Sequence, residues 1–494
     1  MKNNLESVKF DSNPISIADF MNTKYREYWE YSNKDGKNAV DAYEQLPEVV
    51  RKIIFASYKN NLKLGQETKT VKLSGTVSTY HPHGDASIQE SIKGVASDYK
   101  SQVATRLLHG LGNFGDSADS TGAAARYTSV TITPLMNKIF KDIPFVPFDR
   151  EDPELEQPKY ISCPLPMALI NGVSAIGTGK SCYIAERDAQ EVIEWIDILR
   201  KNDWNQNEAK KYPGGEEPAP MSVTGCETWF EPSNGYIYYK AVVHEGVNMN
   251  DIDKKGRYDV ITNLPPKSTA SNVIAKLQTK LPSRITNRII DGSGEGRPTW
   301  IIVPTGYLDE KDYTKYSMQN ARKEQFYIWD HEYHTMRKGN LLNIAKEWFE
   351  DRGRVVTKRI NEQIRAYNAN NHKFDLIKIF AENKMQEWNI EKVEEFFVNL
   401  AKENDFHGFE INEDYNPVNL TCEEAGLKDA SLVLSLSVRT FLPDNIEKNE
   451  ILREKNEIEI KNLKNKIENI GDTIISEAKE IIEAQKKFFA NLND

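Results

Sequence analysis

Residues Asp85–Tyr99, "DASIQESIKGVASDY", give the clearest indication of the fold in the N-terminal part of the chain. The apolar residues Ile88, Ile92 and Val95 recur at intervals of three or four positions, so they share one face of a helix. We therefore expect an amphipathic helix whose apolar face packs on a core.

The segments on either side extend this helix into a larger motif. The apolar spacing of residues 49–63, "VVRKIIFASYKNNLK", predicts a second helix. After a Gly/Ser-rich loop, residues 127–132, "YTSVTI", predict an alternating strand. Residues 51–145 also hold 12 Lys/Arg against 7 Asp/Glu. Helices followed by strands in a locally basic segment predict a winged helix-turn-helix, which can bind phosphates although the whole chain is acidic.

The rest of the chain changes character twice. Residues 185–202 predict an amphipathic helix, and residues 203–340, rich in β-formers, Gly and Pro, predict a separate mixed α/β domain. From Leu341 onward the pattern is helical. Near the C-terminus, apolar residues recur at spacings of three and four, which fits either a coiled-coil seam or an amphipathic helix packed on its own domain. These residues are Ile460, Leu463, Ile467, Ile470 and Ile474.

Composition sets limits on the class of protein. The chain has 494 residues and a net charge of −10, which argues against a general nucleic-acid binder. It has no run of 18 apolar residues and no apolar segment at the start, so we expect neither a membrane span nor a secretory signal. Its four cysteines form no CxxC pair, so we expect neither a disulfide framework nor a zinc site, and a reducing cytoplasmic compartment.

Two short motifs could carry chemistry. In "TYHPHGDAS", His81 and His83 could ligate a metal or contact phosphate, although such pairs are more often structural. In "AAARYT", Tyr127 is a candidate nucleophile. The neighbouring guanidinium of Arg126 favours the phenolate and can stabilise charge on a pentavalent phosphorus.

A third motif, "VSAIGTGKS", resembles the end of a nucleotide-binding P-loop. That loop requires G-x-x-x-x-G-K-[ST] followed by a helix. Here Ser174 occupies the first glycine position, and "CYI" after Ser181 reads as extended chain. We therefore do not expect an ATP site in this stretch.

Taken in order, these segments resemble the cleavage polypeptide of type IIA DNA topoisomerases. That family includes gyrase A, the C subunit of topoisomerase IV, the C-terminal half of eukaryotic topoisomerase II and the phage medium subunit. The motifs of this chain most resemble those of the phage medium subunit. The resemblance spans about residues 25–470 and rests on "RKIIFASYKNNLK", "YHPHGD", "GLGNFGD", "AAARYT", "PMALINGVSAIGTGKSCYI", "KEWFEDRGRVVTKRINEQI" and the segment 434–467.

The resemblance implies roles for the residues in these motifs. Tyr127 would attack a DNA phosphate to form a 5′-phosphotyrosyl bond, and Arg126 would steady the phosphoryl transition state. His81 and His83 would lie against the scissile region.

Further positions match residues that contact DNA in the family. The resemblance places Arg51, Lys52 and Lys72 where the family has basic DNA-contacting residues. Ile176 matches the residue that wedges between base pairs and bends the duplex. One element departs from the family: Asp-Gly-Leu-Lys-Pro is missing before Arg51, and only Lys37 could replace its preceding Arg, which puts phosphate contacts there in doubt.

The resemblance also implies partners. The sequence contains neither a Toprim acidic constellation nor a GHKL ATPase, and the DxD at Asp251–Asp253 reads as solvated surface. Mg²⁺ and ATP would therefore be held by an ATPase/Toprim partner, and this chain would supply no metal site. The expected assembly is a homodimer on double-stranded DNA with two such partners, in the cytoplasm of a bacterial or phage-infected cell.

The expected architecture is α+β and multidomain. It comprises an N-terminal arm (1–24), a winged-helix domain with the tyrosine (25–150), a mixed α/β tower domain (151–340) and a long coiled coil with a C-terminal dimerisation gate (341–494). Three alternatives are open: a rolling-circle nickase with a His-x-His metal site and Tyr127, a P-loop ATPase, and a catalytically idle architectural DNA binder. Pro82 fits the nickase poorly, because that site takes a bulky apolar residue between its histidines.

Overall fold

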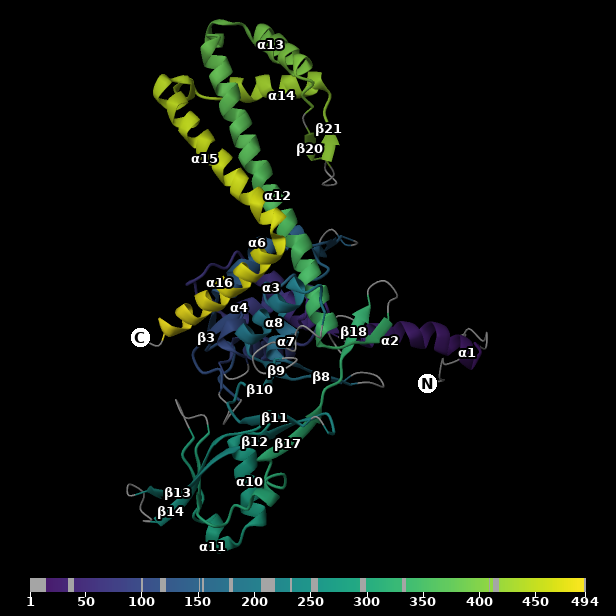
Figure 1. Cartoon of the computed structure of the whole chain (residues 1–494), viewed down its shortest axis with the longest axis vertical. Helices are drawn as coiled ribbons and strands as arrows, with labels where there is room; N and C mark the ends of the chain where they lie inside the picture. Colours follow the sequence, from purple (N-terminus) through teal and green to yellow (C-terminus); the bar gives the residue numbers. More distant parts are fainter. Residues whose placement is uncertain are drawn as a thin grey trace, which may run out of the picture. The chain divides into compact units, whose positions relative to one another are not determined.

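The structure is a computed structural model, and it describes residues 15–33, 40–98, 101–115, 121–150, 152, 155–176, 181–205, 218–231, 233–249, 256–293, 299–330, 335–407, 409–411 and 417–492. The chain divides into two compact units, residues 1–355 with 471–494, and residues 356–470. Both contain helices and small sheets, so the protein is of mixed α/β type, as expected (Figure 1). Among the helices that the structure describes, none combines the length and apolar character that a membrane crossing requires.

The first unit contains the two helices expected from the apolar periodicity, α3 (Glu48–Lys59) and α5 (Asp85–Ala96). Between them lies α4 (Thr70–Tyr80), which the sequence pattern did not predict. Ile88 and Ile92 of α5 are fully buried, which confirms the predicted apolar face. The next helix, α6 (Pro134–Asp142), begins where the Thr133 hydroxyl accepts a hydrogen bond from the Met136 amide.

A small antiparallel sheet accompanies these helices. Its strands β2 (Thr68–Lys69), β4 (Ser129–Ile132) and β3 (Leu108–Leu111) lie in the order β2-β4-β3. The prediction that β4 alternates between buried and exposed residues is wrong, because all four of its residues are buried. β4 is the central strand of this sheet. Helix α16 (Ile470–Ala490) also packs on the sheet, where the ring centroids of Phe489 and His109 lie 5.7 Å apart.

The described residues between 203 and 340 form helices and strands of mixed α/β type, within the same compact unit as the N-terminal helices. Strands β13 (Val242–Met249), β14 (Gly256–Asn263), β16 (Ile301–Pro304) and β15 (Ile290–Asp291) make one sheet, and helix α10 (Ala270–Lys280) packs on it. Strands β11 (Glu227–Glu231), β12 (Tyr236–Lys240) and β17 (Gln319–Lys323) make another. Figure 1 shows both sheets in the lower part of this unit.

The predicted helix at 185–202 begins later than expected. Residues Glu186–Arg187 form strand β9, which pairs with β10 (Pro220–Met221). The carboxylate of Asp188 then accepts hydrogen bonds from the Gln190 and Glu191 amides, and this cap starts α8 (Ala189–Lys201).

The remaining elements of this unit are α1 (Ile17–Phe20), the π-helix η1 (Met21–Tyr25), α2 (Arg26–Asn33), β1 (Val40–Asp41), η2 (Val103–Thr105), η3 (Ile143–Phe145), β5 (Phe148–Asp149), β6 (Gln157–Pro158), α7 (Met167–Asn171), β7 (Val173–Ile176), β8 (Ser181–Ile184), α11 (Ser283–Thr286), η5 (Glu310–Asp312), β18 (Tyr327–Asp330) and β19 (Thr335–Lys338).

The long helix α12 (Leu341–Glu382) starts where helicity was predicted, and a buried ion pair anchors its beginning. Arg352 donates to Asp142 of α6 at 3.0 Å, and both side chains are 1% exposed. Arg352 also donates to the Ser162 carbonyl at 2.9 Å. A buried charge needs such partners, so this network holds the start of α12 against α6.

The second unit consists mainly of helices. It contains the rest of α12 with η6 (Met385–Glu387), α13 (Ile390–Glu403), β20 (Phe409–Ile411), β21 (Pro417–Asn419), α14 (Cys422–Leu434), η7 (Val438–Phe441) and α15 (Pro443–Glu468). Helices α12 and α15 contact each other, and one such contact joins Lys378 to Glu450 at 2.7 Å.

The five apolar positions of the C-terminal pattern are divided between two helices, α15 and α16. Asn469 leaves the helical conformation and separates α15 from α16. Of the five seam residues only Leu463 and Ile474 are buried, and Ile474 belongs to the first unit. After the break, the apolar residues therefore pack on the first unit, as the alternative of a helix packed on its own domain predicts.

Candidate active site

Tyr127 lies in a tight turn, residues 125–127, that leads directly into β4. Its amide donates to the Ala124 carbonyl at 2.9 Å, and the residue is 68% exposed. The guanidinium of Arg126 lies over the phenol ring, 4.7 Å from its centroid. The turn therefore presents a nucleophilic hydroxyl and a cation to solvent together, which suits an anionic substrate.

Two threonines hold this turn in place. The buried Thr128 hydroxyl donates to the Thr70 hydroxyl at 2.8 Å, and the Thr70 amide donates to the Thr128 carbonyl at 3.1 Å. Thr70 is the first residue of α4, and the exposed Lys72 follows it in the same helical turn. The structure thus links the Arg126–Tyr127 turn to the start of the helix that carries Lys72.

The glycine-rich loop before the turn closes around Phe114. A Cβ atom on Gly110 would lie 2.6 Å from the Phe114 ring, so a side chain there would displace the aromatic group. Gly122 adopts φ +60°, and a Cβ atom there would meet the Phe114 backbone at 2.8 Å. Gly110 of "GLGNFGD" and the later Gly122 therefore need glycine for packing around Phe114, which requires no direct chemical role for either.

His81 and His83 lie between α4 and α5, and their rings stack at 3.9 Å with an interplanar angle of 13°. His81 is buried and His83 is exposed. Metal ligation uses lone pairs in the plane of each ring, and parallel stacked rings do not direct these lone pairs to one point. The His-x-His metal site of the nickase alternative is therefore not supported.

Arg51 and Lys52 are buried in α3 instead of facing solvent. Arg51 donates to Glu44 at 2.9 Å and to the Lys159 carbonyl at 2.5 Å. Lys52 donates to the Gln157 side chain. These intramolecular contacts fix α3 to the chain around residues 157–159, so in this structure neither cation is placed to bind a phosphate.

On either side of residues 177–180, the "VSAIGTGKS" motif lies in two antiparallel strands, β7 and β8, which argues against a P-loop. Ile176 pairs with Ser181 at the end of β7 and β8. A strand follows Ser181 where a P-loop requires a helix. The side chain of Ile176, residues 177–180 and two further sequence predictions, Lys37 and Asp251–Asp253, lie outside the described part of the molecule.

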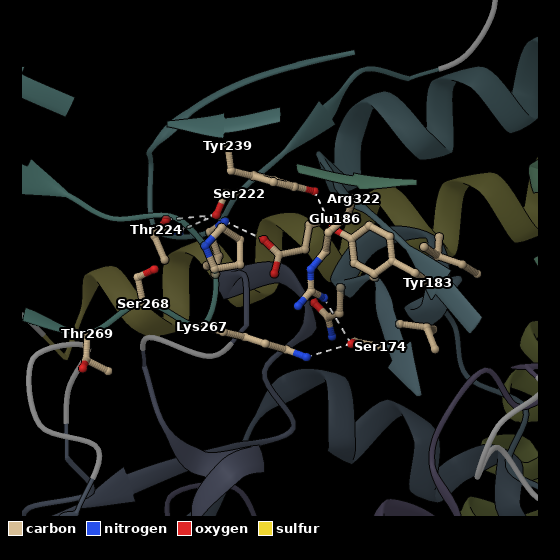
Figure 2. A pocket seen from close by; sticks show the side chains of 16 residues that line it. Ser174, Tyr183, Glu186, Ser222, Thr224, Tyr239, Lys267, Ser268, Thr269 and Arg322 are labelled. Atoms are coloured by element: carbon tan, nitrogen blue, oxygen red, sulfur yellow. Dashed lines mark hydrogen bonds between the residues drawn. The ribbon is translucent and has the colours of Figure 1, made fainter. Parts of the chain in front are cut away.

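A pocket lies beside strands β7 and β8, and two cations converge in it (Figure 2). Lys267 Nζ is 3.0 Å from the Ser174 hydroxyl, and Arg322 Nη1 is 3.3 Å from the same oxygen. Burial, together with the charge of Arg322, lowers the pKa of Lys267. The sequence analysis missed both residues, because no motif marks them and they are 55 positions apart.

The same pocket contains a carboxylate in an unusual environment. Burial raises the pKa of Glu186 to about 7, although the Val223 amide donates to its carboxylate at 2.6 Å. The hydroxyls of Tyr183 and Tyr239, which also line this pocket, lie 2.6 Å apart (Figure 2). The pocket therefore combines two cations, a buried carboxylate and a pair of phenol hydroxyls.

Comparison with known proteins gives a consistent result. The family model that describes the A subunit of DNA gyrase/topoisomerase IV matches residues 42–479. The chain is 28% identical over 289 residues to the A subunit of DNA topoisomerase 4 from Neisseria gonorrhoeae, an alignment that covers 54% of this chain and 35% of that protein. It is 28% identical over 314 residues to the A subunit of DNA gyrase from Campylobacter fetus, which covers 60% and 34%.

The eukaryotic enzyme gives a shorter but more similar match. The chain is 32% identical over 215 residues to DNA topoisomerase 2-alpha of Sus scrofa, which covers 42% of this chain and 13% of that protein. The matches therefore span about a third or less of the length of these relatives.

Proposed function

The chain belongs to the family of DNA gyrase and topoisomerase IV A subunits, and from that premise we propose that it is the DNA-cleaving and religating polypeptide of a type IIA topoisomerase. The observation that carries the proposal is the exposed Tyr127 with the Arg126 guanidinium over its ring. Threonine contacts to α4 hold this turn in place, so the nucleophile is positioned before the substrate arrives.

The proposed reaction is a reversible phosphoryl transfer. The Tyr127 oxygen attacks a backbone phosphorus and loses its phenol proton to solvent. The 5′-phosphotyrosyl bond forms as the bond from phosphorus to the 3′ oxygen breaks, and that oxygen takes up a proton from solvent. Arg126 stabilises the charge that develops on the phosphoryl oxygens. Religation is the reverse attack by the 3′ hydroxyl, which needs no outside energy because the phosphodiester energy is kept in the tyrosyl bond.

The finer architecture follows from the same proposal. Helices α3, α4 and α5 with the sheet β2-β4-β3 form the winged-helix domain, and residues 151–340 form the tower. Within residues 341–494, we assign the coiled coil and the dimerisation gate to the second unit, residues 356–470, because α16 packs on the first unit. Two copies of the chain would each cut one strand, and an ATPase/Toprim partner would supply Mg²⁺ and ATP turnover. The assembly would act in the cytoplasm, where its DNA substrate lies.

DNA contacts are proposed for the accessible residues. Lys72 and His83 are exposed near the two ends of α4. The ring of the buried His81 is held in position by stacking against the ring of His83. Ile176 acts as the wedge at the end of the β7–β8 hairpin. Lys267 and Arg322 sit at the base of that hairpin and supply phosphate contacts beside the wedge. Arg51 and Lys52, which are buried, brace α3 instead.

Plasmid cleavage tests the proposal. The full chain, mixed with the ATPase/Toprim polypeptide of a gyrase or topoisomerase IV, is incubated with supercoiled plasmid, Mg²⁺ and ATP, and the reaction is stopped with detergent. We expect linear DNA carrying a covalent protein adduct at its 5′ ends. Tyr127→Phe abolishes the adduct.

The control is Tyr236→Phe, an exposed tyrosine on β12 that lies far from the turn in sequence and is expected to leave cleavage unchanged. An adduct that persists in Tyr127→Phe would overturn the assignment of the nucleophile. Cutting of single-stranded DNA by the isolated chain with metal would favour the nickase instead.

A further inference from the structure

Three side chains with metal-binding atoms meet in the second unit, away from every motif that the sequence analysis selected. Asp405 and His407 follow the end of α13, and Cys422 is the first residue of α14. One ligand atom from each lies within 4.8 Å of the other two. Carboxylate oxygen, imidazole nitrogen and thiolate sulfur are the three protein donors that Zn²⁺ accepts.

The distances fit the edges of a coordination tetrahedron. His407 Nε2 is 3.2 Å from Asp405 Oδ1 and 3.6 Å from Cys422 Sγ. Zinc bond lengths at a tetrahedral angle place nitrogen and oxygen ligands about 3.3 Å apart, and sulfur and nitrogen ligands about 3.6 Å apart. Two edges therefore already match, and the exposed Asp405 side chain can rotate to adjust the third.

The remaining nitrogen of the imidazole supports the same geometry. His407 Nδ1 lies 3.2 Å from the Leu420 carbonyl, to which it can donate its proton. When Nε2 binds a metal, the proton of the neutral ring is on Nδ1, where the Leu420 carbonyl can accept it. Metal-bound histidines characteristically donate their second ring nitrogen to a carbonyl or carboxylate in this way.

The segment that carries Asp405 is fixed by the cap of α13. The Phe406 amide donates to the Ala401 carbonyl and the Asp405 amide to the Lys402 carbonyl, which is the Schellman pattern. Asp405 takes the left-handed position of this cap with φ 49°, where glycine is usual. An aspartate in a glycine position is explained if its carboxylate has a use there.

The segment that carries Cys422 is fixed by the cap of α14. Thr421 and Glu424 form a capping box. The two helices approach closely, because a Cβ atom on Gly426 would lie 2.6 Å from the Val398 backbone. Asp405 and Cys422 are thus held by helix caps on two packed helices, and His407 lies two residues beyond Asp405.

We propose that Asp405, His407 and Cys422 form a zinc-binding site in which water completes the tetrahedron. Binding releases the Cys422 thiol proton to solvent and joins the end of α13 to the start of α14 beneath the β20–β21 hairpin, which Figure 1 shows projecting from this end of the helix pair. The metal therefore acts as a clamp on the second unit. The proposal is independent of the role of Tyr127.

Cobalt absorption on the full-length, metal-stripped chain tests the site. Co²⁺ alone is titrated, and we expect a thiolate-to-cobalt band in the near ultraviolet and the visible bands of a tetrahedral ion, at one ion per chain. Zn²⁺ then removes both. Cys422→Ser and His407→Ala abolish the thiolate band or weaken binding at least a hundredfold, and Asp405→Asn weakens it about tenfold. Zn²⁺ raises the Tm of the wild-type chain but not of Cys422→Ser.

The matched control is Glu403→Gln, a neighbouring exposed carboxylate outside the cluster, which should bind Co²⁺ like the wild type. Circular dichroism checks that each variant is folded, and Cys422→Ser retains a residue suited to a helix start. Absence of the cobalt bands in the folded wild type overturns the proposal and leaves His407 and Asp405 as an ion pair. Bands that survive in both Cys422→Ser and His407→Ala overturn it as well.

Discussion

Two sets of basic residues from the same N-terminal segment have opposite environments. Arg51 and Lys52 were both expected to touch DNA, yet α3 turns them inward, and Arg51 meets the fully buried Glu44 at 2.9 Å. Arg126 lies in a turn at the start of a strand and remains exposed over the ring of Tyr127. A cation in the sequence is thus available to a ligand only where the fold leaves it without a closer internal partner.

Removing the exposed cation should have the largest effect on activity. We expect Arg126→Ala to lower the cleavage rate by about 10²–10³-fold, the usual loss for one group that stabilises a charged transition state. Arg126→Lys should recover part of the loss, because it keeps the charge but not the planar fork. Adduct formation under single-turnover conditions measures the rate. An unchanged rate with Arg126→Ala would remove it from the proposed chemistry.

Removing the buried cation should affect stability instead. Arg51→Ala leaves Glu44 charged in the interior, and breaking a buried pair in this way costs about 3–5 kcal/mol of unfolding free energy. Denaturant unfolding of the full chain measures this loss. Arg126→Ala serves as the reciprocal control and should change stability by less than about 0.5 kcal/mol. Equal losses from the two variants would mean that burial does not separate the two environments.

Glu186 should make stability depend on pH. Its folded pKa of about 7 lies above the ordinary value of 4.5, so between these values the folded chain retains a proton that the unfolded chain has released. The contribution of Glu186 to the free energy of unfolding is therefore fully present below about pH 4.5. It is lost as the pH rises to about 7, and the total loss is on the order of 3 kcal/mol. Thermal melts across this range should show that Glu186→Gln removes the slope.

A matched variant isolates that slope from other titrations. Glu391→Gln alters an exposed carboxylate of the second unit and should leave the pH profile unchanged. A wild-type slope that persists in Glu186→Gln would assign it to other groups.

The cations of the hairpin pocket should have the smallest effect. Lys267 and Arg322 are proposed to contact phosphates. Replacing either with alanine should then make the slope of the logarithm of the DNA association constant against the logarithm of the salt concentration less steep by about one. Fluorescence anisotropy over a range of salt concentrations measures it. Lys323→Ala, the next residue on β17 and exposed, is the control. Unchanged slopes in both pocket variants would show that this pocket lies away from DNA.

Local structure followed from local patterns to a large extent. Apolar spacing predicts α3, α5 and the start of α12, because one face of each helix must be buried. The same spacing fails after Asn469, since it does not indicate whether the apolar face meets a partner helix or the first unit. The alternation expected for β4 failed because burial of the central strand on both faces depends on elements distant in sequence.

The candidate sites divide in the same way. The motif "AAARYT" selects Arg126 and Tyr127, because the residue types alone carry the chemistry. No sequence pattern selects Lys267 with Arg322, and Asp405, His407 and Cys422 lack the close cysteine spacing by which zinc sites are usually recognised. A search for Asp-x-His with a later cysteine could have suggested this last cluster.

Residue types at short, fixed spacing were enough to identify the family, the helices with clear periodicity and the proposed nucleophile. Contacts between distant segments were needed to establish which cations face solvent, that β7 and β8 pair as antiparallel strands, and that Cys422 meets His407 from 15 positions away. The physical reason is that burial and convergence depend on how the elements pack, and helix caps and buried ion pairs fix that packing in space.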